Sequence, residues 1–226
     1  MPNNMICVLL SSLFLIIGHA TQAEENSVTI TIETEFGAIE ANLYPDRAPI
    51  TVANFLRNID AGLYKNGLFY RVLTQDPSPF GALSLIQGGQ NMEMAKRAPI
   101  EHETTATSGL SHTDGVLSMA RLAPGTATSH FFICIGDNTG LDYSRAKGDS
   151  VERPGYAAFG QVTKGMEVVR KIQRHPFGHR DANDPLVVAV RKDLGAKIAG
   201  ELIPSLLDNS IGMRIRRVQL SNGERL

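Results

Sequence analysis

The amino-acid sequence predicts a mainly β domain, an antiparallel β-barrel or β-sandwich that carries two helices. Many short apolar runs are separated by Gly, Pro, Asn and Asp, which is typical of strands joined by turns. Only two segments repeat their apolar residues clearly at helical spacing. The 226 residues suffice for one domain with a substantial core, and no internal repeat or low-complexity linker divides them. We therefore expect a single domain over residues 27–221.

The first strands are predicted to form a β-hairpin. Apolar and polar residues alternate over 28–33, the pattern of a strand with one buried face. Phe36-Gly37 is a turn signal, and the alternation resumes over 39–43. The other expected strands are the apolar runs at 68–73, 83–86, 116–120, 131–135, 156–162 and 211–220.

Two helices are predicted from the spacing of apolar residues. The first opens at Pro49, and from Val52 onward it places apolar residues at i, i+3, i+4 and i+7. Gly62 ends it as the glycine that often follows a helix C-terminus. The second runs from about Lys164 to Gln173 and is stopped by Pro176.

The N-terminal segment is typical of a secretory signal peptide. Residues 5–17 are almost wholly apolar, and small residues follow at Gly18, Ala20 and Ala23. The run is shorter than the roughly 20 apolar residues that span a bilayer. We expect residues 1–23 to be a signal peptide, cleaved after Ala20 or Ala23, and the mature protein to be periplasmic or secreted. The first four residues contain no Lys or Arg, so an uncleaved membrane anchor and a different start codon remain as alternatives.

Composition gives no indication of a nucleic-acid or membrane-surface partner. The formal net charge is -1, and charged residues make up 20% of the chain. Once the signal is removed, Cys134 is the lone thiol, and its apolar neighbours predict a small buried residue without a disulfide. We expect the mature protein to be a monomer.

Neither a metal nor another cofactor is predicted. His175 and His179 have the spacing of a helical metal pair, but Pro176 between them breaks the helix that would align them. Gly88-Gly89 is not followed by the Lys-Ser/Thr of a phosphate-binding loop. The sequence 101–103, Glu-His-Glu, is interpreted as a solvated loop.

Three local clusters each place one or two polar side chains at the edge of an apolar run, as a binding pocket requires. They are Phe69-Tyr70-Arg71-Val72 with Gln87-Gly88-Gly89, Leu117-Ser118-Met119-Ala120-Arg121 with Phe131-Phe132-Ile133, and Leu141-Asp142 with residues 155–160.

Taken together, these clusters resemble the cyclophilin family, above all its exported bacterial members. Residues 48–55 and 165–169 are similar to the opening and closing helices of that family. The similarity covers about residues 27–172 and returns near 213–220. It implies a closed eight-stranded antiparallel β-barrel capped by two α-helices. It also implies a peptidyl-prolyl cis/trans isomerase, which accelerates rotation about X-Pro bonds in extended or partly folded polypeptides and so assists protein folding.

The resemblance also implies roles for individual residues. Arg71 takes the position of the catalytic arginine, and Gln87 that of the glutamine that orients the substrate and the arginine. Ala120 and Arg121 match the segment whose backbone holds the peptide, and His130 stands where the family usually has Gln. The remaining residues expected to bind substrate around the proline pocket are Phe132, Met119, Leu141, Leu85 and Tyr156.

The chain departs from the family pattern at several places. Insertions are expected near 74–83, 143–154 and 178–209, the last with a possible helix over 186–208. Ser84 aligns with a pocket phenylalanine, and we hypothesise that Phe80 in the first inserted loop supplies the missing ring. Gly140 stands at an aromatic position, so tight cyclosporin binding is not expected. Tyr70 replaces a histidine of many members.

These departures keep a second class of function open. The same barrel could serve as a peptide-binding or chaperone-like module with weak or no isomerase activity. Loss of turnover on substitution of Arg71 by alanine would separate the enzyme from this alternative. An unrelated β-barrel that binds a ligand is the third possibility.

Overall fold

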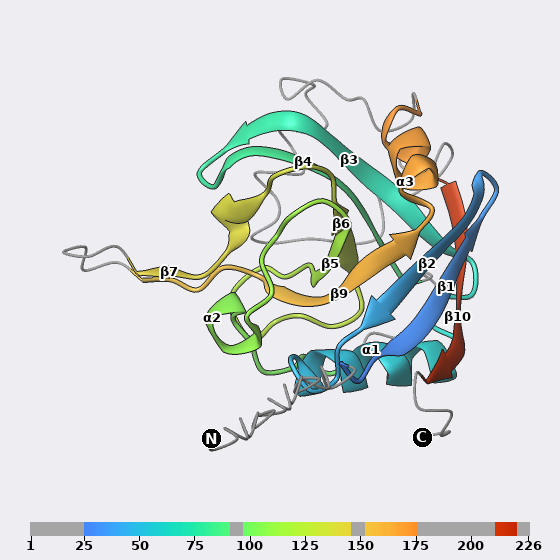
Figure 1. Cartoon of the computed structure of the whole chain (residues 1–226), viewed down its shortest axis with the longest axis horizontal. Coiled ribbons are helices and arrows are strands. Elements are labelled where there is room, and N and C mark those ends of the chain that lie inside the picture. Colours follow the sequence, from blue (N-terminus) through green and yellow to red (C-terminus); the bar gives the residue numbers. More distant parts are fainter. Residues whose placement is uncertain (1–24, 91–96, 146–151, 176–210, 221–226) are drawn as a thin grey trace, which may run out of the picture.

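The computed structural model describes residues 25–90, 97–145, 152–175 and 211–220 (Figure 1). The expected signal peptide, His179 and the insertion at 178–209 with its possible helix lie outside these residues. Of the insertion at 143–154, the structure describes the two ends.

Ten strands and three α-helices make up the described part of the chain. The strands are β1 (Val28–Thr34), β2 (Gly37–Leu43), β3 (Gly67–Ser78), β4 (Gly81–Gly89), β5 (Val116–Met119), β6 (Phe131–Cys134), β7 (Ser144–Arg145), β8 (Glu152–Arg153), β9 (Ala157–Lys164) and β10 (Ile211–Leu220). The helices are α1 (Pro49–Asp60), α2 (Thr105–Ser108) and α3 (Met166–Gln173), with a 3₁₀ turn, η1, at Thr139–Leu141.

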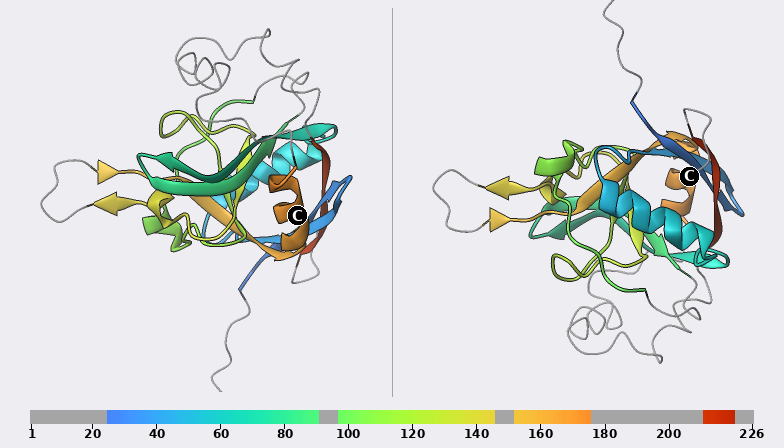
Figure 2. Two further views of the ribbon diagram at one scale, coloured as in Figure 1. Left: turned by 90° about the horizontal axis from the view of Figure 1, so that it is seen from above. Right: turned by 90° about the horizontal axis from the view of Figure 1, so that it is seen from below.

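The prediction of a mainly β barrel is confirmed. Eight strands pair in the closed order β1-β10-β3-β4-β6-β5-β9-β2, and every pairing between neighbours is antiparallel. Helices α1 and α3 cover opposite ends of the barrel, as the two turned views make clear (Figure 2). Strands β7 and β8 form a separate ribbon that projects from the barrel and closes the described ends of the insertion at 143–154.

The predicted hairpin and both predicted helices are present. Strands β1 and β2 pair from Val28 opposite Leu43 to Thr34 opposite Gly37, which fixes the register around the Phe36-Gly37 turn. Helix α1 has Pro49 in its first turn. Gly62 follows its C-terminus with φ of 70°, the left-handed conformation that the sequence predicted there.

The barrel interior is an aromatic and aliphatic core that α1 seals at one end. Phe55 of α1 lies 5.3 Å from Phe131 and 5.0 Å from Phe159, measured between ring centroids. All three rings are completely buried. Burial of side chains of this size is the main source of stability in a domain of this kind.

The interpretation of residues 101–103 as a solvated loop is wrong for Glu103. Its side chain is 8% exposed, and its two carboxylate oxygens accept the backbone N–H groups of Ile50 and Thr51 at 3.0 and 2.8 Å. These N–H groups belong to the first turn of α1, where backbone N–H groups have no hydrogen-bonding partner within the helix. Glu103 therefore supplies the cap that α1 lacks from its own flanking residue Ala48.

The expected insertion near 74–83 is a continuation of strands β3 and β4 and not a loop. Thr74 lies opposite Ser84, and the pairing continues outward to Ser78 opposite Gly81. A register shift between Thr74 and Asp76 accompanies the positive φ of Gln75, 60°, which identifies a β-bulge. The result is a long twisted hairpin that extends beyond the barrel wall (Figure 1).

Among the described residues, no helix is both long and apolar enough to cross a lipid bilayer.

Candidate active site

One row of paired residues crosses the sheet and assembles the predicted catalytic groups. Arg71 of β3 lies opposite Gln87 of β4, and Gln87 lies opposite Phe132 of β6. Phe132 in turn lies opposite Ser118 of β5, and Ser118 opposite Ala158 of β9. Directly opposed residues of antiparallel strands point to the same face of a sheet. The outer face of the barrel therefore carries Arg71, Gln87 and Phe132 side by side.

A chain of hydrogen bonds fixes the arginine on this face. Nη1 of Arg71 donates to Oε1 of Gln87 at 2.9 Å, and Nε2 of Gln87 donates to the hydroxyl of Tyr70, also at 2.9 Å. The Tyr70 hydroxyl lies 3.0 Å from Nδ1 of His130. Arg71 is exposed, so a ligand in solution can reach its guanidinium.

Tyr70 is a neutral hydroxyl in this chain. Burial raises its pKa to about 12, against the opposing effects of the Gln87 hydrogen bond and the nearby charge of Arg71. A neutral phenol both accepts and donates, so it can take the Gln87 N–H and offer its own proton to His130. Tyr70 thereby connects Gln87 to His130 through its hydroxyl.

A second apolar cluster lies beside Arg71 and is separate from the barrel core. Phe132 is 3% exposed and lies within it. Of the expected pocket residues, Leu85 and Leu141 are buried in the same cluster, and Phe80, Ala120 and Tyr156 pack against it from its edge. Its other buried members are Leu73, Leu83, Val116, Cys134 and Ala158.

The rim of this cluster is aromatic. The Tyr156 ring makes edge-to-face contacts with Phe132, at 5.7 Å, and with Phe80, at 6.0 Å between centroids. The Arg121 guanidinium carbon lies 4.6 Å from the centre of the Tyr156 ring, a cation–π arrangement. Nη2 of Arg121 also donates to the carbonyl of Gly155. Phe80 thus reaches the cluster from the far end of the long hairpin.

Arg71 beside an apolar cluster is the arrangement that the resemblance to cyclophilins implies. The comparison with known families tests whether the chain belongs to that family. Residues 29–191 match the family model of the cyclophilin type peptidyl-prolyl cis-trans isomerase. The chain belongs to the cyclophilin family.

Individual relatives support this assignment. The chain is 39% identical over 176 residues to the peptidyl-prolyl cis-trans isomerase of Acinetobacter baylyi, covering 76% of this chain and 82% of the relative. It is also 39% identical over 149 residues to peptidyl-prolyl cis-trans isomerase B of Escherichia coli, covering 64% and 83%. The relatives that match this chain thus include bacterial peptidyl-prolyl cis-trans isomerases.

A solved structure shows the same fold. The crystal structure of a Cryptosporidium parvum cyclophilin type peptidyl-prolyl cis-trans isomerase matches with a TM-score of 0.59 at 20% identity. The match covers 85% of this chain and 98% of that structure. At this identity the likeness concerns the fold alone.

One residue of the sequence-based site, Met119, lies elsewhere than expected. Met119 is completely buried and belongs to the barrel core, because it follows Ser118 on the strand and faces the opposite side. The structure therefore places Met119 apart from the other candidate residues. Ser84 also faces away from the cluster, since its hydroxyl accepts from Nε2 of Gln173 in α3 at 2.8 Å.

The space near Leu141 is filled by the hairpin tip. A Cβ added to Gly140 would overlap the backbone carbonyl of Phe80, so this cyclophilin has its glycine where the long hairpin passes over η1. The long β3–β4 hairpin therefore occupies the space that an aromatic side chain at position 140 would need.

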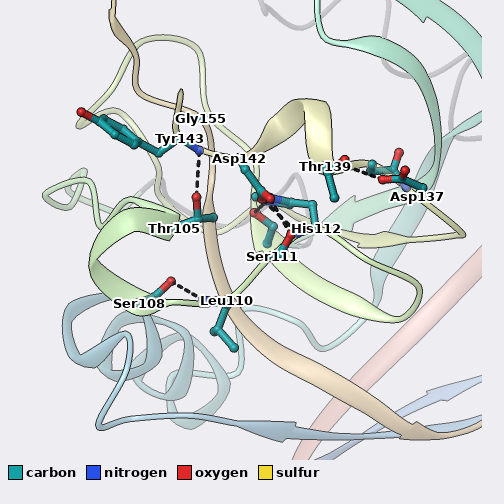
Figure 3. Close-up of polar contacts among 12 residues, drawn as sticks. Thr105, Ser108, Leu110, Ser111, His112, Asp137, Thr139, Asp142, Tyr143 and Gly155 are labelled. Atoms are coloured by element: carbon teal, nitrogen blue, oxygen red, sulfur yellow. Dashed lines mark hydrogen bonds and ion pairs between the residues drawn. The ribbon is translucent and has the colours of Figure 1, made fainter. Parts of the chain in front are cut away.

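His112 was missed by the sequence analysis, and Ser118 and Asp142, which lie in two of the local clusters, were assigned no role there. These three polar residues form a hydrogen-bonded chain behind Phe132. Partners of His112 stand 6 and 30 positions away in sequence, so no local spacing could reveal them. Figure 3 shows Asp142 between Ser111 and His112.

The thiol of Cys134 lies within the apolar cluster. Cys134 is completely buried in the apolar cluster, and burial raises the pKa of its thiol far above the ordinary value. It is therefore a packed thiol, in agreement with the sequence-based interpretation. Within the described ranges, no three His, Cys, Asp or Glu side chains gather as metal ligands.

Proposed function

We propose that this cyclophilin catalyses cis/trans isomerisation of X-Pro peptide bonds, with Arg71 as the catalytic residue. The observation that carries the proposal is the row Arg71–Gln87–Phe132. It sets a permanent cation next to an apolar cluster of the kind that holds a proline ring.

The reaction needs a twisted amide and no broken bond. Resonance gives the C–N bond of a peptide partial double-bond character and a rotation barrier of roughly 18–20 kcal/mol. Uncatalysed exchange at proline takes about tens of seconds or longer. An enzyme accelerates it by binding the twisted form, in which the nitrogen lone pair is localised, better than either planar form.

Arg71 suits this role because a guanidinium stays charged at any physiological pH and donates in a fixed plane. A donor directed at the prolyl nitrogen withdraws the lone pair from resonance with the carbonyl. Gln87 accepts one N–H of Arg71 and so limits its rotation. Each tenfold of rate requires about 1.4 kcal/mol of preferential transition-state binding.

The apolar cluster supplies the pocket for the proline ring. Phe132, Leu141 and Leu85 form its floor in this proposal, and Tyr156 forms part of its rim. Ala120 and Arg121 lie at the edge where an extended peptide can run along the sheet, with His130 beside them. Ala120 already shares a backbone hydrogen bond with the carbonyl of His130, at 2.9 Å.

Phe80 provides the ring that position 84 lacks. It packs on the edge of the cluster and contacts Tyr156, while Ser84 points to α3. Replacement of Phe80 by alanine should weaken binding of prolyl peptides, measured by NMR titration. Unchanged affinity and unchanged turnover would rule this role out.

The site of action follows from the N-terminal segment. We place the protein in the periplasm or outside the cell, with residues 1–23 removed as a signal peptide and a monomeric domain over residues 27–221 acting on proline-containing polypeptides. Expression of the full chain in a Gram-negative host, followed by fractionation and N-terminal sequencing, tests this. An intact N-terminus in the cytosolic fraction would contradict export.

Exchange NMR on a short X-Pro peptide is the direct test of the activity. The wild-type chain should increase the exchange rate between cis and trans resonances, and the Arg71→Ala variant should lose most of that increase. Arg71→Lys keeps the charge but not the planar fork, so it should recover little. A folded wild-type protein that binds the peptide without faster exchange would favour the chaperone-like alternative.

A further inference from the structure

A chain of hydrogen-bonded polar side chains runs behind the pocket. Its inner members, His112 and Ser118, are completely buried, whereas the Asp142 side chain is 22% exposed. Nδ1 of His112 lies 2.6 Å from Oδ1 of Asp142, which also accepts the backbone N–H of His112 at 3.0 Å. The other oxygen, Oδ2, accepts from the hydroxyl of Ser111 at 2.5 Å (Figure 3). On the far side of the ring, Nε2 of His112 lies 2.9 Å from Oγ of Ser118.

The order serine, histidine, carboxylate is that of a nucleophilic triad, but this one cannot act as such. Both Ser118 and His112 are 0% exposed. Ser118 lies between Phe132 and Ala158 in the sheet, so no substrate carbonyl can reach its hydroxyl. A nucleophile must lie within contact distance of the atom that it attacks. These hydrogen-bonded side chains therefore stabilise the structure around the pocket and do not react with a substrate.

The hydrogen bonds determine the tautomer and orientation of the imidazole. A carboxylate only accepts, so Nδ1 of His112 carries the proton that is shared with Asp142. Nε2 then accepts the proton of the Ser118 hydroxyl. Both edges of the ring are held, and its plane is fixed. That plane lies 20° from the plane of the Phe132 ring, with 6.0 Å between the centroids.

The acidic end of the chain is joined to the pocket wall. Asp142 directly follows Leu141, whose carbonyl accepts the backbone N–H of Tyr156 at 2.9 Å. A Cβ on Gly155 would come within 2.6 Å of the Asp142 carbonyl carbon, so the backbone before Tyr156 lies directly against Asp142. One imidazole thus contacts the ring of Phe132 and, through Asp142, the segments that carry Leu141 and Tyr156.

We propose that His112 is a positioning residue for prolyl isomerisation: it holds Phe132 in a fixed relation to Leu141 and Tyr156 and so sets the shape of the proline pocket. This inference rests on the proposed function. The pocket holds the proline ring in the planar and the twisted forms alike. Loss of His112 should therefore weaken binding of substrate and transition state together, which raises KM and leaves kcat nearly unchanged.

The test uses the full chain and four variants. His112→Phe keeps an aromatic ring against Phe132 and removes both side-chain hydrogen bonds. Asp142→Ala removes the carboxylate, whereas Asp142→Asn keeps an oxygen that accepts from His112. His175→Phe is the matched control, because His175 contacts the ring of Phe36 and neither residue belongs to the apolar cluster of the pocket.

The first two variants should raise KM for a prolyl peptide about tenfold, with kcat changed by less than about twofold. Asp142→Asn should recover most of the affinity, and His175→Phe should match the wild type. A second readout needs no turnover: NOEs between the rings of Phe132 and Tyr156 should weaken in His112→Phe. If that variant does not fold, the Asp142→Ala and Asp142→Asn pair carries the same comparison.

Unchanged KM and unchanged ring NOEs in folded variants would overturn the inference. That failure is distinct from failure of the proposed function. If the wild-type chain accelerated no exchange, the isomerase proposal would fail, whereas the role of His112 would still be read from peptide affinity and from the NOEs.

Discussion

The backbone carbonyl of Phe80 occupies the space into which any side chain at Gly140 would project. These residues belong to the tip of the β3–β4 hairpin and to η1, and the hairpin tip passes directly over the turn that carries Leu141. The close approach holds Phe80 next to Tyr156. The glycine at position 140 thereby allows the hairpin tip to lie directly against η1.

Replacement of Gly140 by alanine should push the hairpin tip away from η1. Backbone atoms cannot rotate aside as a flexible side chain can, so we expect a loss of roughly 1–3 kcal/mol in the free energy of unfolding. Chemical denaturation measures this, and faster amide exchange at Phe80 locates it. Gly125→Asn is the control, because no atom lies within 4 Å of a Cβ there and asparagine tolerates the positive φ of 76°. Equal stability of Gly140→Ala and the wild type would show that the contact is loose.

Strong local patterns made much of this fold predictable. The β1–β2 hairpin, α1 and α3 follow from apolar periodicity, and Gly62 follows from the geometry of a helix C-terminus. The outer part of the long hairpin did not follow, because Asp76-Pro77 interrupts the alternation and the bulge at Gln75 changes its phase. A polar segment with two prolines is more often a loop than a strand.

The site was predictable only in part, for a similar reason. Arg71 and Gln87 came from the family resemblance, and the pairing of β3 with β4 brings them together. Strand β5 is buried on both faces, so its sequence does not tell which side Met119 faces. The cap from Glu103 depends on a contact 52 to 53 positions away, which no local pattern contains.

Tyr70 should matter for the rate although it lies behind Gln87. Its hydroxyl accepts the Gln87 N–H, and Gln87 in turn restrains Arg71. Tyr70→Phe keeps the ring and removes this acceptor, so kcat/KM for an X-Pro peptide should fall about three- to tenfold, mainly through kcat. Exchange NMR at several peptide concentrations separates the two parameters.

Tyr44→Phe provides the comparison for Tyr70→Phe, since it removes a phenol hydroxyl that lies directly after β2 and near Arg47. A fall of the same size in both variants would point to a general effect on stability. An unchanged kcat in Tyr70→Phe would mean that Gln87 holds Arg71 without help from the tyrosine.

Glu103 should contribute to stability through the N-terminus of α1. Glu103→Ala leaves the N–H groups of Ile50 and Thr51 without their carboxylate partner, and it removes a negative charge from the positive end of the helix dipole. We expect a loss of about 1–2 kcal/mol, measured by urea denaturation. The neighbouring Glu101→Ala is the control, because Glu101 is exposed and should change stability by less than about 0.5 kcal/mol. Equal losses in the two variants would contradict the capping role.

His112 should make stability depend on pH in the mildly acidic range. Burial lowers the pKa of its imidazole below the ordinary value of 6.5, and the hydrogen bond and charge of Asp142 oppose that effect without cancelling it. The unfolded chain therefore binds the proton more readily than the folded chain does between the two pKa values. Since stability rises with pH wherever the unfolded state binds more protons, the contribution is complete above 6.5 and is lost as the pH falls toward the folded pKa.

Urea denaturation at a series of pH values from about 7.5 to 5 measures this dependence. The wild-type chain should lose stability across the range, and His112→Phe should lose less, because phenylalanine takes up no proton in the unfolded state. Asp142→Asn should steepen the loss, since the neutral amide no longer opposes the cost of charging a buried imidazole. His175→Phe retains His112 and should follow the wild-type curve. Parallel curves for the wild type and His112→Phe would mean that other groups carry the acid sensitivity and that the pKa of His112 is not lowered on folding.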